Sequence, residues 1–225
     1  MLKVLKKGYT TGVHTSFAFK SALQNFVATK NLSITKTIKM DNDDLDVTKG
    51  CEIVVSISSN FNELELNQIE HKPYILKSNN TTLEIYAGVG VGVVTKDGLK
   101  PQKNYPAINP KPLEVLEKIF STYGKNLGDI YCTVSVTNGE QIATQTANAK
   151  VGVVGGISIL GTTGFVKPIS ATAYICSIEE ELNFALANAF GTIIFALGNS
   201  AYKKAIKLNN NAYIIEIGNF IYDGI

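Results

Sequence analysis

Residues 150–164 are the most informative about the fold of this chain. They read Lys150-Val151-Gly152-Val153-Val154-Gly155-Gly156-Ile157-Ser158-Ile159-Leu160-Gly161-Thr162-Thr163-Gly164. The apolar run at the start predicts a strand, and the glycines and hydroxyl residues that follow predict a loop. Beyond this loop, helical and strand-like patterns alternate, which is typical of a parallel sheet whose strands are joined by helices. The expected elements are a helix from about 172 to 190, a strand at 192–197, a short helix after Asn199 and a strand at 212–217.

Before residue 149 the sequence is typical of a mixed α+β subdomain. Apolar residues at helical spacing predict an amphipathic helix over His14–Lys30, entered through a glycine- and threonine-rich segment at residues 8–12. The dipeptide Asn138-Gly139 predicts a hairpin between strands 129–136 and 141–146. Further predictions are strands 35–40, 51–58 and 82–95, a helix from Pro112 to Gly124, and loops at 41–46, 60–80 and 101–112.

The predicted fold class is therefore α+β combined with α/β, in two subdomains. The first, at residues 1–148, is a mixed two-layer α/β subdomain. The second, at residues 149–225, is a small Rossmann-like βαβαβ subdomain that carries a glycine-rich ligand loop.

The composition excludes several functional classes. Of the 225 residues, 45% are apolar, which is enough for a folded core. The 21 basic residues are all lysine, and 19 residues are acidic, which gives a net charge of +2. This small charge does not indicate binding to nucleic acid or to an anionic membrane. The three cysteines and two histidines lack metal-ligand spacing, so no metal site is predicted. We expect a cytoplasmic protein without signal peptide or membrane span, and homo-oligomerisation stays open.

Four segments contain candidate functional residues, and each has a structural alternative. Residues 155–164 can offer backbone N–H groups to a phosphate or carboxylate, or form only a tight turn. The glycines of residues 88–92 allow a ligand or another backbone to approach closely. The acidic residues of 41–46 can bind a metal, ribose hydroxyls or a proton, or lie in a solvated loop. His14, near a helix N-terminus, can act as a neutral donor or acceptor, or be a satisfied structural residue.

Five segments together resemble one protein family closely. They are Gly8-Tyr9-Thr10-Thr11-Gly12, the run from Asp43 to Gly50, the run from Gly88 to Lys96, Pro106-Ala107-Ile108-Asn109-Pro110, and Gly155 to Gly164. The chain is similar in these segments, and in their order, to the CbiD family, the cobalt-precorrin-5B C1-methyltransferases of anaerobic cobalamin biosynthesis.

The resemblance implies transfer of a methyl group from S-adenosylmethionine to C1 of the cobalt-containing tetrapyrrole cobalt-precorrin-5B, giving cobalt-precorrin-6A. In-line methyl transfer needs mainly positioning and desolvation. On this basis we expect Asp44, Asp46 and His14 as catalytic candidates, with Asp43 as a further one. The expected cofactor-binding residues are Gly155, Gly156, Ser158, Gly161, Thr162, Thr163 and Gly164. The expected substrate-binding residues are Thr10, Thr11, Gly12, Gly88, Gly90, Gly92, Lys96 and Lys167, with lysines and N–H groups receiving the carboxylates of the macrocycle.

Two features depart from the family pattern. Val13-His14 stands where members commonly read Thr-Cys, and the family continues past Asn219-Phe220 into a segment with a Gly-His-x-Gly-Lys motif, whereas this chain ends at Ile225. The alternative hypothesis is therefore a C-terminally shortened, catalytically silent chain that still binds the tetrapyrrole or a partner protein.

Overall fold

The chain divides into two compact units in the computed structural model, which describes residues 5–166, 168, 171–209, 211–218 and 220. The first unit comprises Met1–Thr95 and Lys100–Pro168, and the second comprises Lys96–Leu99 and Ile169–Ile225. The helices and strands of the two units confirm the predicted mixed α/β fold class. The division falls later than the predicted 148/149 boundary, because residues 153–166 pair with strands of the first unit. That the two units act as separate domains stays a prediction.

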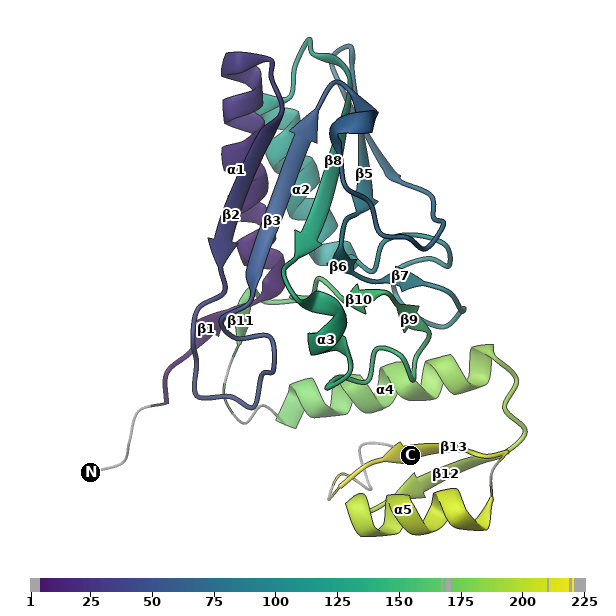
Figure 1. Cartoon of the computed structure of the whole chain (residues 1–225). Coiled ribbons are helices and arrows are strands. Elements are labelled where there is room, and N and C mark those ends of the chain that lie inside the picture. The colour runs from purple at the N-terminus through teal and green to yellow at the C-terminus, as the bar shows by residue number, and fades with distance from the viewer. Residues whose placement is uncertain (1–4, 167, 169–170, 210, 219, 221–225) are drawn as a thin grey trace. The chain divides into compact units, whose positions relative to one another are not determined.

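A five-stranded mixed sheet forms the centre of the first unit (Figure 1). Its strands lie in the order β2 (Ser33–Ile38), β3 (Glu52–Ser58), β8 (Gly128–Val136), β5 (Thr81–Ala87) and β4 (Tyr74–Ser78). Only the β5–β8 pair is parallel. Alternation places one face of each strand inward, and Ile53, Val55 and Ile57 of β3 are fully buried.

Two helices, α1 (Thr11–Thr29) and α2 (Pro110–Tyr123), cover one face of this sheet (Figure 1). Their buried side chains include Phe19 and Leu23 of α1 and Phe120 of α2, all with no exposed surface. Each such side chain contributes about 1.5–3 kcal/mol through burial. Thr10 caps α1 by accepting a hydrogen bond from the Val13 N–H.

Three pairs of two-residue strands connect the segment after residue 150 to earlier parts of the first unit. The pair β1 (Gly8–Tyr9) and β11 (Phe165–Val166) is antiparallel, and so is the pair β7 (Val93–Val94) and β9 (Val153–Val154). The pair β6 (Gly90–Val91) and β10 (Gly156–Ile157) is parallel. The predicted strand at 150–154 is therefore not the first strand of a Rossmann-like sheet, since residues 153–154 pair with β7 of the first unit and Val151 and Val153 are buried there.

The second unit contains α4 (Ala171–Ala187), β12 (Ile193–Ala196), α5 (Asn199–Leu208) and β13 (Tyr213–Glu216). Strands β12 and β13 are parallel and are joined by α5, so a single βαβ crossover stands where βαβαβ was predicted. Ala196, Ala205 and Ile214 are buried together at the centre of this crossover.

Two local predictions were wrong. Asn138-Gly139 does not turn a hairpin but begins the short helix α3 (Gly139–Ala143). Asn138 has the left-handed φ of 57° that this dipeptide favours. A Cβ on residue 139 would lie 2.1 Å from the Gly90 backbone oxygen, so the close approach of these two segments requires glycine there. The predicted loop 60–80 contains the 3-10 helix η1 (Phe61–Glu63) and strand β4. Strand β4 is an edge strand in which only Leu76 is buried, so its sequence alternates weakly.

Candidate ligand-binding site

Two of the predicted motifs, 149 residues apart, meet at the start of α1. The Leu160 N–H donates to Thr11 Oγ1 at 2.8 Å, and the Gly12 N–H donates to the Leu160 carbonyl at 2.8 Å. The Thr10 N–H donates to the Gly164 carbonyl at 3.1 Å. Pairing of β1 with β11 extends this contact. The glycine-rich segments 8–12 and 161–164 therefore form one structural element.

A groove with a cavity volume of about 400 Å³ opens beside this contact. Its walls come from the first half of α1, from α2 and from residues 161–164. The volume lies within the usual range of small-ligand sites, roughly 300–1,000 Å³. We call this cavity the α1–α2 groove. Several of the predicted residues converge on this groove, namely Thr10, Gly12, Gly161, Thr162, Thr163 and Gly164.

The backbone at the start of α1 is not free to receive an anion. The N–H groups of Thr10 and Gly12, predicted to bind substrate carboxylates, already donate to protein carbonyls. Thr11 is buried, and its hydroxyl is bonded to Leu160. This corrects the prediction for the N–H groups of Thr10 and Gly12.

The glycine strand at residues 88–92 is packed against protein backbone and side chains. An added Cβ would lie 2.0 Å from Ser135 Oγ at Gly88 and 2.0 Å from the Val136 oxygen at Gly90. At Gly92 it would lie 2.4 Å from a methyl group of Val153. The sequence left open whether a ligand or another part of the chain approaches these glycines. In the structure, another part of the chain lies next to them.

The first half of the 155–164 loop likewise has internal partners. Asn67, which is buried, donates from Nδ2 to the carbonyls of Val91 and Gly155, both at 2.8 Å. An added Cβ on Gly156 would lie 2.2 Å from the Gly90 oxygen. The Ser158 hydroxyl donates to Asn148 Oδ1 at 3.2 Å. The predicted cofactor loop is therefore divided, and only residues 161–164 border the α1–α2 groove.

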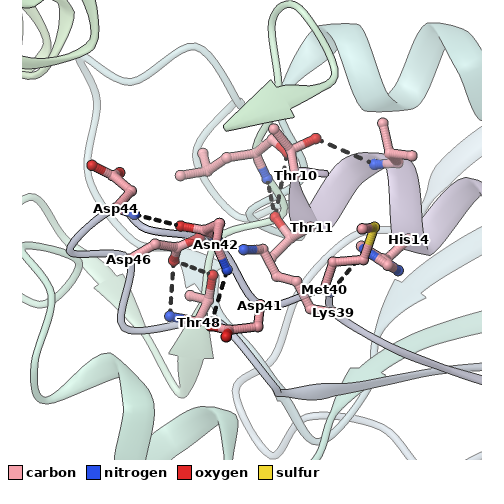
Figure 2. Close-up of polar contacts among 12 residues, drawn as sticks. Thr10, Thr11, His14, Lys39, Met40, Asp41, Asn42, Asp44, Asp46 and Thr48 are labelled. Carbon is pink, nitrogen blue, oxygen red and sulfur yellow. Dashed lines mark hydrogen bonds and ion pairs between the residues drawn. The ribbon is translucent and has the colours of Figure 1, made fainter. Parts of the chain in front are cut away.

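The acidic loop 41–46 lies beside the start of α1, where Asn42 packs on Gly8 (Figure 2). Asp46 forms an ion pair with Lys39, whose side chain is 1% exposed. Asp46 Oδ1 also accepts from the N–H and the hydroxyl of Thr48, at 2.9 and 2.5 Å. Burial alone would raise the pKa of Asp46, but the bonds from Lys39 and Thr48 outweigh it, so the pKa lies below its ordinary value.

The other two acidic candidates also have partners in this loop. Asp43 accepts a hydrogen bond from the Lys6 N–H at 2.8 Å. The backbone N–H of Asp44 donates to Asn42 Oδ1 at 2.9 Å. These contacts hold the loop in place, and a catalytic role for Asp44 or Asp46 stays a prediction.

His14 has the environment of a structural residue. It is 5% exposed, and its Nε2 accepts a hydrogen bond from the Met40 N–H at 3.2 Å (Figure 2). Burial, with a smaller contribution from the charge of Lys39, lowers the pKa of His14. The ring is therefore neutral, and it connects the end of β2 to α1.

Two lysines that sequence reasoning missed line the groove. Lys96 belongs to the second unit, where its Nζ lies 5.6 Å from the centroid of the Phe184 ring. Lys167 lies outside the described residues. Lys20 of α1 and Lys111 of α2 border the α1–α2 groove. No motif marks them, because only the packing of the two helices brings them together.

Fold and site define a two-unit α/β protein with an open groove for a small ligand. A family model described as CbiD matches residues 26–168, more than half of the chain. The chain therefore belongs to the CbiD family.

Curated relatives carry the name cobalt-precorrin-5B C(1)-methyltransferase. The chain is 37% identical over 200 residues to the protein of Methanococcus maripaludis (strain C5), covering 88% of this chain and 52% of the relative. It is 33% identical to that of Methanocaldococcus jannaschii, covering 97% and 63%, and 32% identical to that of Geobacter sp. (strain M21), covering 98% and 66%. The chain thus spans about half the length of the Methanococcus relative.

A solved structure titled cobalamin biosynthesis protein (cbiD) from Archaeoglobus fulgidus is 23% identical, with a TM-score of 0.48, and the match covers 98% of this chain and 73% of that one. Within the described part of this chain, no helix is both long enough and apolar enough to span a membrane.

Proposed function

We propose that this chain methylates cobalt-precorrin-5B at C1, giving cobalt-precorrin-6A, with S-adenosylmethionine as methyl donor. The observation that carries the proposal is membership of the CbiD family together with 32–37% identity to relatives that bear this enzyme's name. The α1–α2 groove supports it, because two of the segments that resemble the family build that groove.

The work expected of the protein is positioning. An electron-rich ring carbon attacks the methyl carbon in line with the bond to sulfur, so the orientation of the macrocycle decides the rate. The groove supplies an apolar surface on two helices, which hold a ligand better than a mobile loop does. The residues Thr10, Thr162 and Thr163 add hydroxyl groups beside these helices.

The groove residues fit the macrocycle better than the methyl donor. The sulfonium centre and the amino group of S-adenosylmethionine are cations, and Lys20 and Lys111 would repel them. None of the described residues that line the groove is acidic, so none provides a carboxylate for ribose hydroxyls. This departs from the expectation that Thr162 and Thr163 bind the cofactor. We therefore derive no step through the cofactor at this site.

The test is methyl transfer by the purified chain. The substrate is cobalt-precorrin-5B made enzymatically, the donor is S-adenosylmethionine with an isotopically labelled methyl group, and the macrocycle is examined by mass spectrometry. The full-length Methanocaldococcus relative serves as the positive control. We expect the labelled methyl group in the product. Transfer by the relative but not by this chain would refute the proposal.

The second candidate is a catalytically silent chain that binds the tetrapyrrole or a partner. It is favoured by the observation that this chain spans about half the length of one relative. Calorimetric titration with S-adenosylhomocysteine separates the two. An active chain binds this product, and a silent ring-binding chain binds only the macrocycle.

A further inference from the structure

The α1–α2 groove has an apolar bed that faces solvent. Val13 and Phe17 come from α1, and Val115 and Ile119 come from α2. Phe17 is 52% exposed and Val115 is 37% exposed. Exposed apolar side chains that gather in one hollow indicate a ligand surface more strongly than scattered ones do.

The charge of the groove has one sign. Lys20 and Lys111 approach it from the two helices, and no acidic residue is found among its described lining residues. The chain has no arginine, so these lysines are point charges on flexible stems. A ligand that fits the groove is therefore apolar on its face and anionic at its edge.

Both lysines have only weak partners in the protein. Lys20 Nζ lies 5.5 Å from the centroid of the Tyr123 ring. Lys111 Nζ lies 2.7 Å from a carboxylate oxygen of Glu114, with both side chains about half exposed, at 53% and 51%. Exposed contacts of these kinds are weak, because solvent screens them. Carboxylates of a ligand can therefore replace these partners at little cost.

We propose that the α1–α2 groove binds a planar macrocycle through its apolar bed, with Lys20 and Lys111 each binding a peripheral carboxylate; this rests on the proposed function, of which it names the substrate-binding residues. The hydroxyls of Thr10 and Thr162 lie on the same groove and can bond further polar groups of the ring edge. A methyl donor is the less suitable occupant because of its positive charge.

The experiment compares two cobalt corrins that differ in edge charge. Dicyanocobyrinic acid carries carboxylates on its ring edge, whereas dicyanocobinamide carries amides on the same ring. Each is titrated into the whole chain by calorimetry at low and high salt. The variants are Lys20→Met and Lys111→Met, with Lys118→Met as the matched control, since Lys118 is an exposed lysine of α2 outside the groove lining.

We expect the acid corrin to bind more tightly than the amide corrin and to weaken with salt. Each groove variant should lower its affinity about tenfold, as for loss of one charge-assisted hydrogen bond. Lys118→Met should leave it unchanged, and affinity for the amide corrin should be similar in all four proteins. These substitutions are at the surface, so thermal melts should coincide.

The outcomes that overturn the proposal are distinct. If the parent binds the acid corrin and the two groove variants bind it equally well, the groove assignment is refuted while the proposed function stands. If the groove variants lose S-adenosylhomocysteine instead of corrin, the groove is the cofactor site and the proposal is also refuted. If the parent binds neither corrin, this inference fails, and the methyl-transfer assay decides the proposed function separately.

Discussion

Replacing Asp46 with asparagine should destabilise the first unit severely, because it leaves a buried lysine charge without its partner. Lys39 is 1% exposed and Asp46 is 15% exposed, so water cannot take over the ion pair. The asparagine carbonyl can still accept from Thr48, so the substitution isolates the charge. Breaking a buried pair by removing one partner costs about 3–5 kcal/mol. At about 2–4 °C per kcal/mol in a protein of this size, the melting temperature should fall by about 6–20 °C.

The assay is thermal and urea unfolding followed by circular dichroism, with Glu114→Gln as the matched control. Glu114 and Lys111 are both about half exposed, so solvent screens their pair and breaking it should leave the melting temperature almost unchanged. Adding Lys39→Met to Asp46→Asn should restore much of the loss, since it removes the unpaired charge. The reasoning is refuted if Asp46→Asn costs no more than the control, or if the double variant is no more stable than the single one.

The same pair gives a pH dependence with a defined sign. The folded pKa of Asp46 is below its ordinary value, because bonds from Lys39 and Thr48 outweigh the effect of burial. Its contribution to stability is therefore complete above the unfolded pKa and is lost as the pH falls through the folded one. A proton-transfer role for Asp46 predicts a different result, namely lost activity with unchanged stability.

Three further predictions concern the first unit. Gly90→Ala would place a methyl group 2.0 Å from a backbone oxygen of β8 at a φ of +80°, and should lower the free energy of unfolding by about 3 kcal/mol or more. Gly50→Ala is the control: its φ is +74° but the space around it is open, so urea unfolding should show a loss of only about 1–2 kcal/mol. Because burial and Lys39 lower the folded pKa of His14, stability should fall as the pH drops from the ordinary histidine value through the folded one, and His14→Gln should flatten that fall in melts across a pH series. Asn67→Asp removes the amide group that donates to the carbonyls of Val91 and Gly155, each at 2.8 Å, and should lower the free energy of unfolding by about 2 kcal/mol or more. An unchanged melting temperature would contradict the view that Asn67 holds these two segments together.

Much of the fold could be predicted from local pattern. The helix at His14–Lys30, the strand at 51–58 and the helix ending at Gly124 agree with α1, β3 and α2 to within a few residues. In each, buried side chains follow the period of the element, as Ile53, Val55 and Ile57 do in β3. Strand β4 could not be found in this way, since an edge strand with one buried residue has almost no pattern.

The errors share a physical cause, which is contact between segments distant in sequence. The strand at 150–154 has the apolar run of a parallel strand, yet it pairs antiparallel with β7. Asn138 adopts the expected left-handed conformation, yet the chain continues into α3, whose first residue, Gly139, lies against the backbone of Gly90. The glycines of 88–92 were recognised as sites of close approach, but their neighbour could not be identified from the sequence.

The segments at Thr10–Gly12 and Gly161–Gly164 were both identified from the sequence and border one groove, but a binding role for them stays a prediction. The N–H groups of Thr10 and Gly12, expected to bind anions, are bonded within the protein, because the two segments bond each other. Lys20 and Lys111 lie on different helices and carry no motif, so only the packing of α1 on α2 reveals them.

The bonds between the start of α1 and residues 160–164 also determine when that helix can be finished during protein synthesis. The partners of Gly12 and Thr10 are the carbonyls of Leu160 and Gly164. At about 5–20 residues per second, a ribosome needs about 7–30 s to make the 149 residues that separate Thr11 from Leu160. During that interval the N–H groups of Thr10 and Gly12 lack these carbonyl partners, and the groove has no third wall. Helix α1 is thus synthesised well before the contacts at its N-terminus can form.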